Sequence, residues 1–356
     1  MIIGVPKEIK DGERRVGLTP EGARALIAAG HTVKVQASAG AGSGFAESEY
    51  SQVGATVVSS ARAAFDADLV VKVKEIQPNE WRELKPDSAL FCFQHLQSDG
   101  EMARELLARR ITAIAYETVE DARGQLPLLA PMSAIAGELA ITIGANALMA
   151  PHGGSGVMLR DASVLVVGMG VVGQAAARTA RALGAKVLCF GRAAQGEVRA
   201  ATELAEHLAN ADLVVGAANT RGARSPRMIS CAEVARMRPG SVIVDVCIDG
   251  GGIAETSRPT THAEPMFVEA GVIHYCVPNM PAAVPRSATR ALCTATLPYV
   301  EALARLGIWG ALRADAGLAA GLHMAGGQLT HEGVAAALGL PCTPADALLH
   351  RCGLPG

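Results

Sequence analysis

The chain has 356 residues, of which 50% are hydrophobic and 19% are charged, and its formal net charge is -2. This length exceeds one ordinary hydrophobic core, so two domains are expected. The near-neutral balance, without a basic block, excludes a nucleic-acid or anionic-membrane surface as the natural partner.

Strand and helix patterns alternate through the first third of the chain. Thr19-Pro20-Glu21 is typical of a helix start, with a capping hydroxyl followed by proline, and the helix should end near Gly30. A second helix is predicted at Gly100–Arg109. The predicted strands are Ile2–Val5, Thr32–Gln36, Leu69–Lys72, Leu90–Phe93 and Thr112–Ala115. Such alternation predicts a parallel sheet covered by helices on both faces.

The alternation restarts after a long alanine-rich helix, predicted at Met132–Met149. A second long helix is expected at Ala288–Leu306, and a short one at Thr330–Leu338. The strands predicted in this half are Val164–Val167, Lys186–Phe190, Leu213–Val215 and Val242–Asp245.

The two long helices bracket the second set of strands. We therefore predict an α/β fold of two Rossmann-like domains with parallel sheets and a cleft between the domains. A dinucleotide-binding domain, residues 130–300, would be inserted into a catalytic domain made of residues 1–129 and 301–356.

The eight cysteines are scattered and form no CxxC pair, which is typical of reduced, mostly buried thiols and not of a metal site. The longest apolar stretch, Ala134–Ala150, contains Glu138 and Asn146 and is short for a membrane span. The N-terminus runs directly into a strand and has no secretory pattern. We therefore expect a cytoplasmic protein without a metal.

A glycine-rich loop follows the strand Val164–Val167 and precedes a helix predicted at Gln174–Leu183. Its pattern, Gly168-x-Gly170-x-x-Gly173, predicts a dinucleotide site in this strand-to-helix context. Gly168 would permit the tight turn, Gly170 the approach of the pyrophosphate, and Gly173 close packing of helix on strand. The alternative is a glycine-bearing turn that binds nothing.

The next strand lacks the carboxylate that usually binds the adenosine ribose at its end. Gly191 and Arg192 follow Phe190 instead, with Arg199 nearby. Arginine pairs with a ribose 2′-phosphate where a carboxylate would repel it, so we expect NADP to be preferred to NAD. The alternative is that Arg192 is an ordinary solvated surface residue.

Ionisable residues stand at the ends of otherwise apolar strands. Lys72 and Lys74 flank Val73 and should share one face, His95 follows a strand, and Asp249 precedes three glycines. Ligands of open α/β sheets bind beyond the carboxyl ends of strands. Each residue also has an ordinary structural interpretation: a packed histidine, a turn aspartate, or solvated charges such as Arg14 and Arg15.

Taken together, the chain resembles the alanine dehydrogenase and transhydrogenase family, and is closest to alanine dehydrogenases. The segments that carry the resemblance span the chain in order: Gly4–Ile9, Glu13–Pro20, Gly40–Phe45, Val71–Glu75, Leu128–Ser133, Asp245–Asp249, Ser257–Thr261 and Val277–Pro285.

The resemblance implies a role for each matching residue. Arg15 and Lys74 would bind the substrate carboxylate and carbonyl, His95 would be the general acid/base, and Asp249 would assist proton transfer. Together with the residues of the glycine-rich loop and its neighbours, the predicted cofactor-binding residues are Ser133, Gly168, Gly170, Val171, Val172, Gly173, Gly191, Arg192, Ala217, Ile248, Asn279 and Met280.

The sequence departs from the family pattern at several positions. Gly191 replaces the ribose-binding aspartate, Gly250 replaces a glutamine after Asp249, and Thr294 replaces an asparagine. The segment after the phosphate loop, Ala193–Ala211, is also short. These changes concern cofactor and substrate identity more than the class of reaction.

We therefore predict an NAD(P)-dependent amino-acid dehydrogenase that interconverts L-alanine, or a similar small amino acid, with the 2-oxo acid and ammonia. One alternative is a specialised 2-oxo-acid or imine reductase with another substrate. A second is a transhydrogenase-type nucleotide-binding subunit, but Asp121–Pro127 lacks the Arg-Gln-Asp motif of that group. The resemblance also implies a homo-oligomer, a hexamer or a dimer.

Overall fold

The computed structural model describes residues 1–218 and 224–351, which divide into two compact units. Unit 1 comprises residues 1–131 and 284–356, and unit 2 comprises residues 132–283. Unit 2 is therefore an insertion in unit 1. The predicted boundary after residue 300 falls inside a helix, Pro285–Leu306, that lies in unit 1.

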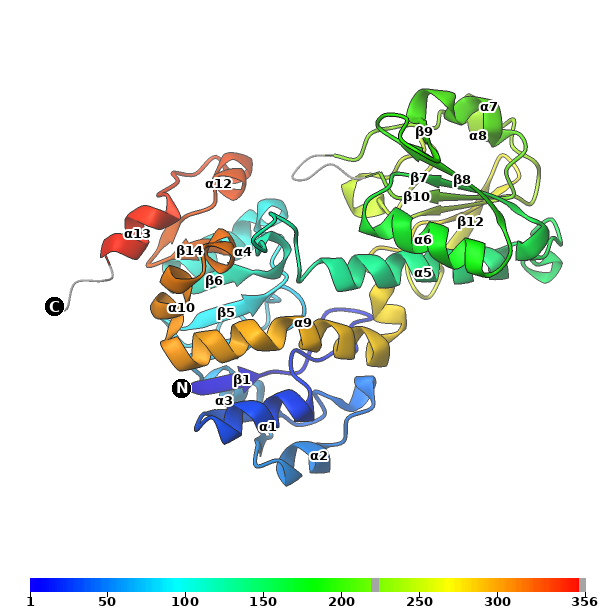
Figure 1. Cartoon of the computed structure of the whole chain (residues 1–356). Coiled ribbons are helices and arrows are strands. Elements are labelled where there is room, and N and C mark those ends of the chain that lie inside the picture. Colours follow the sequence, from blue (N-terminus) through cyan, green and yellow to red (C-terminus); the bar gives the residue numbers. More distant parts are fainter. Residues whose placement is uncertain (219–223, 352–356) are drawn as a thin grey trace. The chain divides into compact units, whose positions relative to one another are not determined.

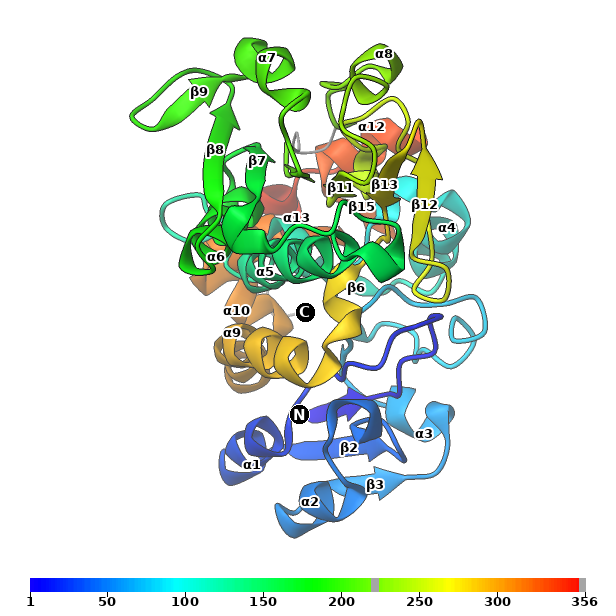
Figure 2. The same cartoon turned by 90° about the vertical axis from the view of Figure 1, so that its right-hand side faces the viewer.

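Unit 1 is built on one eight-stranded sheet in the order β15-β14-β6-β5-β4-β1-β2-β3. Its strands are β1 (Ile2–Val5), β2 (Thr32–Gln36), β3 (Thr56–Val58), β4 (Leu69–Val71), β5 (Ala89–Cys92), β6 (Thr112–Ala115), β14 (Leu322–Ala325) and β15 (Gln328–Leu329). The helices are α1 (Pro20–Ala28), α2 (Glu47–Gln52), α3 (Ala61–Phe65), α4 (Gly100–Ala108), α9 (Pro285–Leu306), α10 (Ile308–Ala314), α11 (Ala316–Ala320), α12 (Glu332–Leu338) and α13 (Ala345–Arg351). Figure 2 shows α1 and α9 on one side of this sheet and α3 and α4 on the other.

Unit 2 contains a seven-stranded sheet in the order β12-β13-β11-β10-β7-β8-β9. Its strands are β7 (Ser163–Val167), β8 (Lys186–Gly191), β9 (Val198–Ala200), β10 (Leu213–Gly216), β11 (Val242–Asp245), β12 (Met266–Glu269) and β13 (Val272–Tyr275). The helices are α5 (Ala130–Ala147), α6 (Val171–Ala182), α7 (Leu204–Leu208) and α8 (Cys231–Val234).

The central strands of unit 2 are buried on both faces. Val164 and Val166 of β7 pack in the core beneath α5 and α6, whereas Leu165 and Val167 face a second core with α7 and α8. Figure 1 shows these helix pairs on opposite sides of the sheet. This two-sided burial explains why the sequence of β7 is continuously hydrophobic.

In both sheets the chain starts at a central strand, adds strands on one side of it, and then adds strands on the other side. This reversal falls between β1 and β4 in unit 1 and between β7 and β10 in unit 2. This doubly wound order places ligand sites at the carboxyl ends of the strands near the reversal. The expected fold class of two Rossmann-like domains is confirmed.

The sheets are mostly parallel, as predicted, but antiparallel strands lie at their edges. β12 pairs antiparallel with β13, and β14 pairs antiparallel with both β6 and β15. Two of these pairs are hairpins joined by two residues with positive φ, Ala270-Gly271 and Gly326-Gly327. A two-residue connection can only join antiparallel neighbours.

Within the described residues, no helix is long and apolar enough to cross a membrane. The seven cysteines of the described residues are free thiols, and five of them are buried. The eighth, Cys352, lies outside the described residues.

Candidate active site

Three candidate segments of unit 1 follow adjacent parallel strands and therefore lie at one edge of the sheet. Lys74 follows β4, His95 follows β5, and Glu117 follows β6. The main-chain ladder continues past β4 and β5, since the Phe93 N–H donates to the Val73 carbonyl at 3.0 Å. The sheet itself therefore brings the lysine and histidine segments together.

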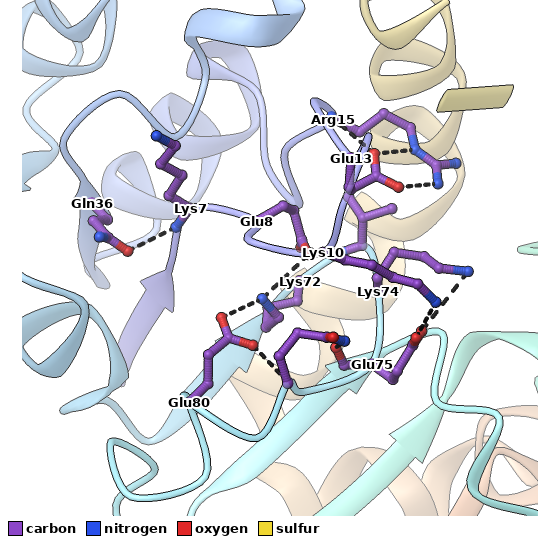
Figure 3. Close-up of polar contacts among 12 residues, drawn as sticks. Lys7, Glu8, Lys10, Glu13, Arg15, Gln36, Lys72, Lys74, Glu75 and Glu80 are labelled. Atoms are coloured by element: carbon purple, nitrogen blue, oxygen red, sulfur yellow. Dashed lines mark hydrogen bonds and ion pairs between the residues drawn. The ribbon is translucent and has the colours of Figure 1, made fainter. Parts of the chain in front are cut away.

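Arg15 is buried next to this edge, with only 2% of its surface exposed. Its Nε and Nη2 donate to the two oxygens of Glu13 at 2.7 and 2.6 Å, and Figure 3 shows this paired geometry. A Cβ at Gly17 would lie 2.6 Å from the Val71 carbonyl, so the loop packs tightly on the end of β4. The guanidinium is thus held rigidly beside the end of β4.

Lys72 belongs to a buried ion cluster and not to a ligand site. Its Nζ lies 2.8 Å from Glu80 and 3.2 Å from Glu8. Burial disfavours its charge, but the two carboxylates outweigh this and raise the pKa of Lys72. Glu8 also accepts from the Val73 N–H at 2.7 Å, which fixes the main chain between the two lysines.

Lys74 has a different environment from Lys72, although the sequence predicted that the two share a face. Its Nζ lies 3.8 Å from Glu75, which is also paired with Lys10, and all three are drawn in Figure 3. Burial is the main cause that lowers the pKa of Lys74, and the cations Lys10 and Arg15 act in the same direction. Lys74 is therefore the lysine suited to receive an anionic ligand.

His95 has a left-handed backbone, with φ of 47°, and 42% of its side chain is exposed. Its ring is nearly parallel to that of Phe93, with centroids 6.3 Å apart. The imidazole is therefore accessible from outside the protein, as a group that acts as a general acid/base must be. The carboxylate of Glu117 accepts from the His95 main-chain N–H at 2.7 Å.

The glycine-rich loop of unit 2 has the backbone that the sequence predicted. Gly168 has φ of 101°, and a Cβ at Gly173 would lie 1.8 Å from the Gly168 carbonyl oxygen. A Cβ at Gly170 would meet no atom within 4 Å, so the loop is open where α6 begins. Open space at a helix N-terminus fits a dinucleotide pyrophosphate.

The end of β8 leaves no open space beside Gly191. A Cβ at Gly191 would lie 2.9 Å from Val198 Cγ1, so β9 already fills the space that the missing side chain would leave. Arg192 is exposed, whereas Arg199 pairs with Glu203 at 3.3 Å. Arg192 is therefore the better candidate cation for a 2′-phosphate.

Asp249 is exposed on a single 3₁₀ turn, Ile248–Gly250, after β11. The turn is organised by the buried Asp245, which accepts from the Ile253 N–H at 2.7 Å and the Ser257 hydroxyl at 2.6 Å. A Cβ at Gly250 would lie 2.4 Å from Ser225 Oγ. Packing of Ser225 thus leaves little room for a side chain at Gly250.

The remaining candidate cofactor residues are also in unit 2. Asn279 has a left-handed backbone, with φ of 57°. The others are Ser133 in α5, Val171 and Val172 in the first turn of α6, Ala217 after β10, Ile248 beside Asp249, and Met280. Arg15, Lys74 and His95 therefore lie in unit 1, and Asp249 with the whole nucleotide set lies in unit 2.

Three carboxylates that hold the predicted site residues were not predicted from the sequence: Glu13 beside Arg15, Glu117 beside His95, and Asp245 beside the turn that carries Asp249. Glu13 and Asp245 lie within segments that carry the family resemblance, but no role was predicted for either. Glu117 follows a buried strand, as His95 does, and this position was the available signal. Among the described residues, no group of three or more His, Cys, Asp or Glu side chains is arranged to hold a metal ion.

Comparison with known proteins gives consistent matches over nearly the whole chain. The family models for the N-terminal and C-terminal domains of alanine dehydrogenase/PNT match residues 4–136 and 140–332. The alanine dehydrogenase of Halomonas elongata is 45% identical over 98% of this chain and 100% of its own length.

Solved structures agree with the sequence matches. An L-alanine dehydrogenase structure is 44% identical with a TM-score of 0.91, covering 95% of this chain and 99% of its own. A transhydrogenase from Sinorhizobium meliloti is 25% identical with a TM-score of 0.79, covering 93% of this chain and 99% of its own.

Proposed function

Because the chain belongs to the alanine dehydrogenase/PNT family, we propose that it is a nicotinamide-dependent dehydrogenase acting on L-alanine or a similarly small amino acid. The reaction interconverts the amino acid with its 2-oxo acid and ammonia. The identity of 45% to an alanine dehydrogenase, against 25% to a transhydrogenase, favours a self-contained enzyme over a nucleotide-binding subunit.

One observation carries this proposal: two buried cations and a half-exposed histidine share one sheet edge in unit 1. Arg15 and Lys74 are suited to the substrate carboxylate and carbonyl, because a charge-assisted bond is strong where water is excluded. His95 exchanges the protons of the reaction, and Asp249 assists. The loop Gly168–Gly173 and its neighbours in unit 2 hold the nucleotide.

The chemistry assigns a task to each of these groups. When bound, a nicotinamide supplies the acceptor for the hydride that leaves the amino-bearing carbon. The amine first loses a proton to solvent, and loss of the hydride leaves an iminium to which water adds. His95 takes the proton that this water loses and gives it to the departing nitrogen. Ammonia leaves, and the remaining hydroxyl loses its proton, assisted by Asp249, to give the 2-oxo acid.

A substrate screen tests the proposal. Small 2-oxo acids are supplied with ammonia and either reduced nicotinamide, and the nicotinamide absorbance is followed. We expect pyruvate or a close analogue to be consumed only when ammonia is present. Reduction without ammonia would favour the 2-oxo-acid reductase instead, and no turnover with any acid would overturn the proposal.

We further propose that NADP is accepted at least as well as NAD. No carboxylate stands at the end of β8 to repel a 2′-phosphate, and the exposed Arg192 can pair with one. One such pair is worth roughly 1.5–3 kcal/mol, or about 10- to 150-fold in preference. A wild-type kcat/KM ratio that strongly favours NAD would refute this.

A variant that restores the carboxylate at position 191 must also make room for it beside β9. Gly191→Asp alone would place its Cβ against Val198, so the informative variant is Gly191→Asp combined with Val198→Ala. We expect it to shift the ratio toward NAD, whereas Val198→Ala alone should leave the ratio unchanged.

The assembly and location are also proposals. The chain is expected to act as a homo-oligomer, a hexamer or a dimer, in the cytoplasm. Light scattering coupled to size-exclusion chromatography measures the first, and fractionation of cells measures the second.

A further inference from the structure

The backbone that carries His95 is in a conformation that non-glycine residues rarely adopt. Its φ of 47° lies in the left-handed region, which persists only where neighbouring groups hold it. The imidazole direction depends on this backbone, because the side chain starts from it. Whatever holds the turn therefore also aims the histidine.

One carboxylate receives both main-chain N–H groups of this turn. Glu117 Oε1 accepts from the His95 N–H at 2.7 Å and from the Gln94 N–H at 3.1 Å. Its second oxygen lies 3.2 Å from the Gln94 nitrogen. Successive N–H groups that converge on one anion form a stable concave turn.

The contact of Glu117 with the imidazole itself is weaker. Its oxygen is 3.8 Å from His95 Nδ1, beyond hydrogen-bond distance, while 12% of its side chain is exposed. The carboxylate therefore acts mainly on the main chain of His95.

The turn that carries Glu117 is also connected to the neighbouring strand β14 and to α12. Its neighbour Thr118 hydrogen-bonds His323 Nε2 at 2.8 Å. The ring of His323 packs on His331, with centroids 4.5 Å apart, and His331 Nδ1 accepts from the first turn of α12 at 3.3 Å. This chain of contacts ties the turn Tyr116–Thr118 to β14 and α12.

We propose that Glu117 is a positioning residue that holds the His95 backbone in its left-handed turn and so aims the imidazole at the substrate. This inference rests on the proposed role of His95 as the general acid/base. Glu117 acts through its oxygen position, so a neutral acceptor of the same length replaces it.

Two variants separate position from charge. Glu117→Gln loses the charge but keeps an oxygen that can accept hydrogen bonds from both N–H groups. Glu117→Asp keeps the charge, but its side chain is one methylene shorter, so the carboxylate lies farther from both N–H groups. We expect kcat of Glu117→Gln to stay within about 3-fold of wild type and that of Glu117→Asp to fall by about 10- to 100-fold, as misplacement of a reacting group does. Nucleotide affinity and circular dichroism should be unchanged in both.

A double-variant cycle tests whether Glu117 acts through His95. In a His95→Gln background, Glu117→Asp should lower kcat no further, because coupled residues are not additive. Glu101→Gln, an exposed carboxylate on α4 of the same unit, is the control and should match wild type.

The outcomes distinguish this inference from the proposed function. If His95→Gln has normal turnover, the role of His95 is wrong and the inference fails with it. If His95→Gln is impaired but Glu117→Asp equals wild type, only the positioning role fails. The positioning role also fails if Glu117→Asp is active while Glu117→Gln is inactive. It fails as well if the losses in the double-variant cycle are additive.

Discussion

Arg15 and Lys74 are cations held in different ways at the same sheet edge. The forked guanidinium of Arg15 is matched by both oxygens of Glu13, at 2.7 and 2.6 Å. Lys74 has a looser contact of 3.8 Å with a carboxylate that Lys10 already pairs with. The arginine is thus preorganised, whereas the lysine gains most from an arriving anion.

Substitution of Lys74 tests this difference. Lys74→Met keeps the length of the side chain and removes the charge, while Glu75 retains Lys10. We expect kcat/KM for the substrate to fall by about 10- to 150-fold, the worth of one charge-assisted bond at a desolvated site. Nucleotide affinity, measured by fluorescence titration, should not change. Lys85→Met, on the exposed surface of the same unit, is the control, and equal losses of substrate and nucleotide affinity would indicate a structural role.

The proposed acid/base residues, His95 and Asp249, give a second prediction at this scale. His95→Ala and Asp249→Ala should each lower kcat by at least ~10²-fold, the usual contribution of a positioned proton donor or acceptor. Both variants should bind the nucleotide normally, since neither residue belongs to the glycine-rich loop. Near-normal turnover in His95→Ala would remove it from the mechanism.

At the scale of elements, the glycines of unit 2 serve different purposes. Gly137 lets α5 approach α6, because a Cβ there would lie 2.2 Å from the Val172 carbonyl oxygen. Gly170, at the start of α6, borders only open space. The first is required by the fold, whereas the second matters only for the ligand that we propose for this loop.

Alanine substitution separates the two requirements. Gly137→Ala should lower the free energy of unfolding by about 1–3 kcal/mol through overpacking. Gly170→Ala should leave stability unchanged but weaken nucleotide binding by about 10-fold, equivalent to about 1.4 kcal/mol. Thermal unfolding by circular dichroism and nucleotide titration measure these effects. Unchanged binding in Gly170→Ala would contradict the assignment of the loop.

At the scale of the molecule, a buried histidine makes the stability of unit 1 depend on pH. His323 is 1% exposed, and burial, with smaller contributions from His331 and His95, lowers its pKa from 6.5 to about 3. The unfolded chain therefore binds more protons than the folded one between these values. The contribution of His323 to the free energy of unfolding is therefore complete above pH 6.5. It is lost as the pH falls toward 3, by up to about 1.4 kcal/mol per pH unit.

The variant His323→Gln should remove this dependence. Both tryptophans, Trp81 and Trp309, lie in unit 1, so their fluorescence during urea unfolding reports on that unit. We expect the stability difference between wild type and variant to shrink as pH is lowered from 6.5. A difference that is constant with pH would show that His323 does not titrate in this way.

The sequence by itself determined the elements whose signals are local. β1, β2, β6 and β11 have the predicted bounds, because apolar runs between turn residues specify buried strands. Thr19 caps α1, and Gly168 adopts a positive φ, as their residue types require. The edge hairpins were missed, although Gly326-Gly327 is a recognisable turn signal, because β14 and β15 are short and far in sequence from β6.

Only the tertiary structure decided how the candidate residues are held. Lys72 and Lys74 are two residues apart, yet the distant Glu8 and Glu80 make one a buried structural ion and leave the other suited to a ligand. Val198 fills the space beside Gly191, and Ser225 fills the space beside Gly250. Such outcomes depend on which residues the fold brings together, and a side chain's charge and available volume are set by those neighbours and not by its own residue type.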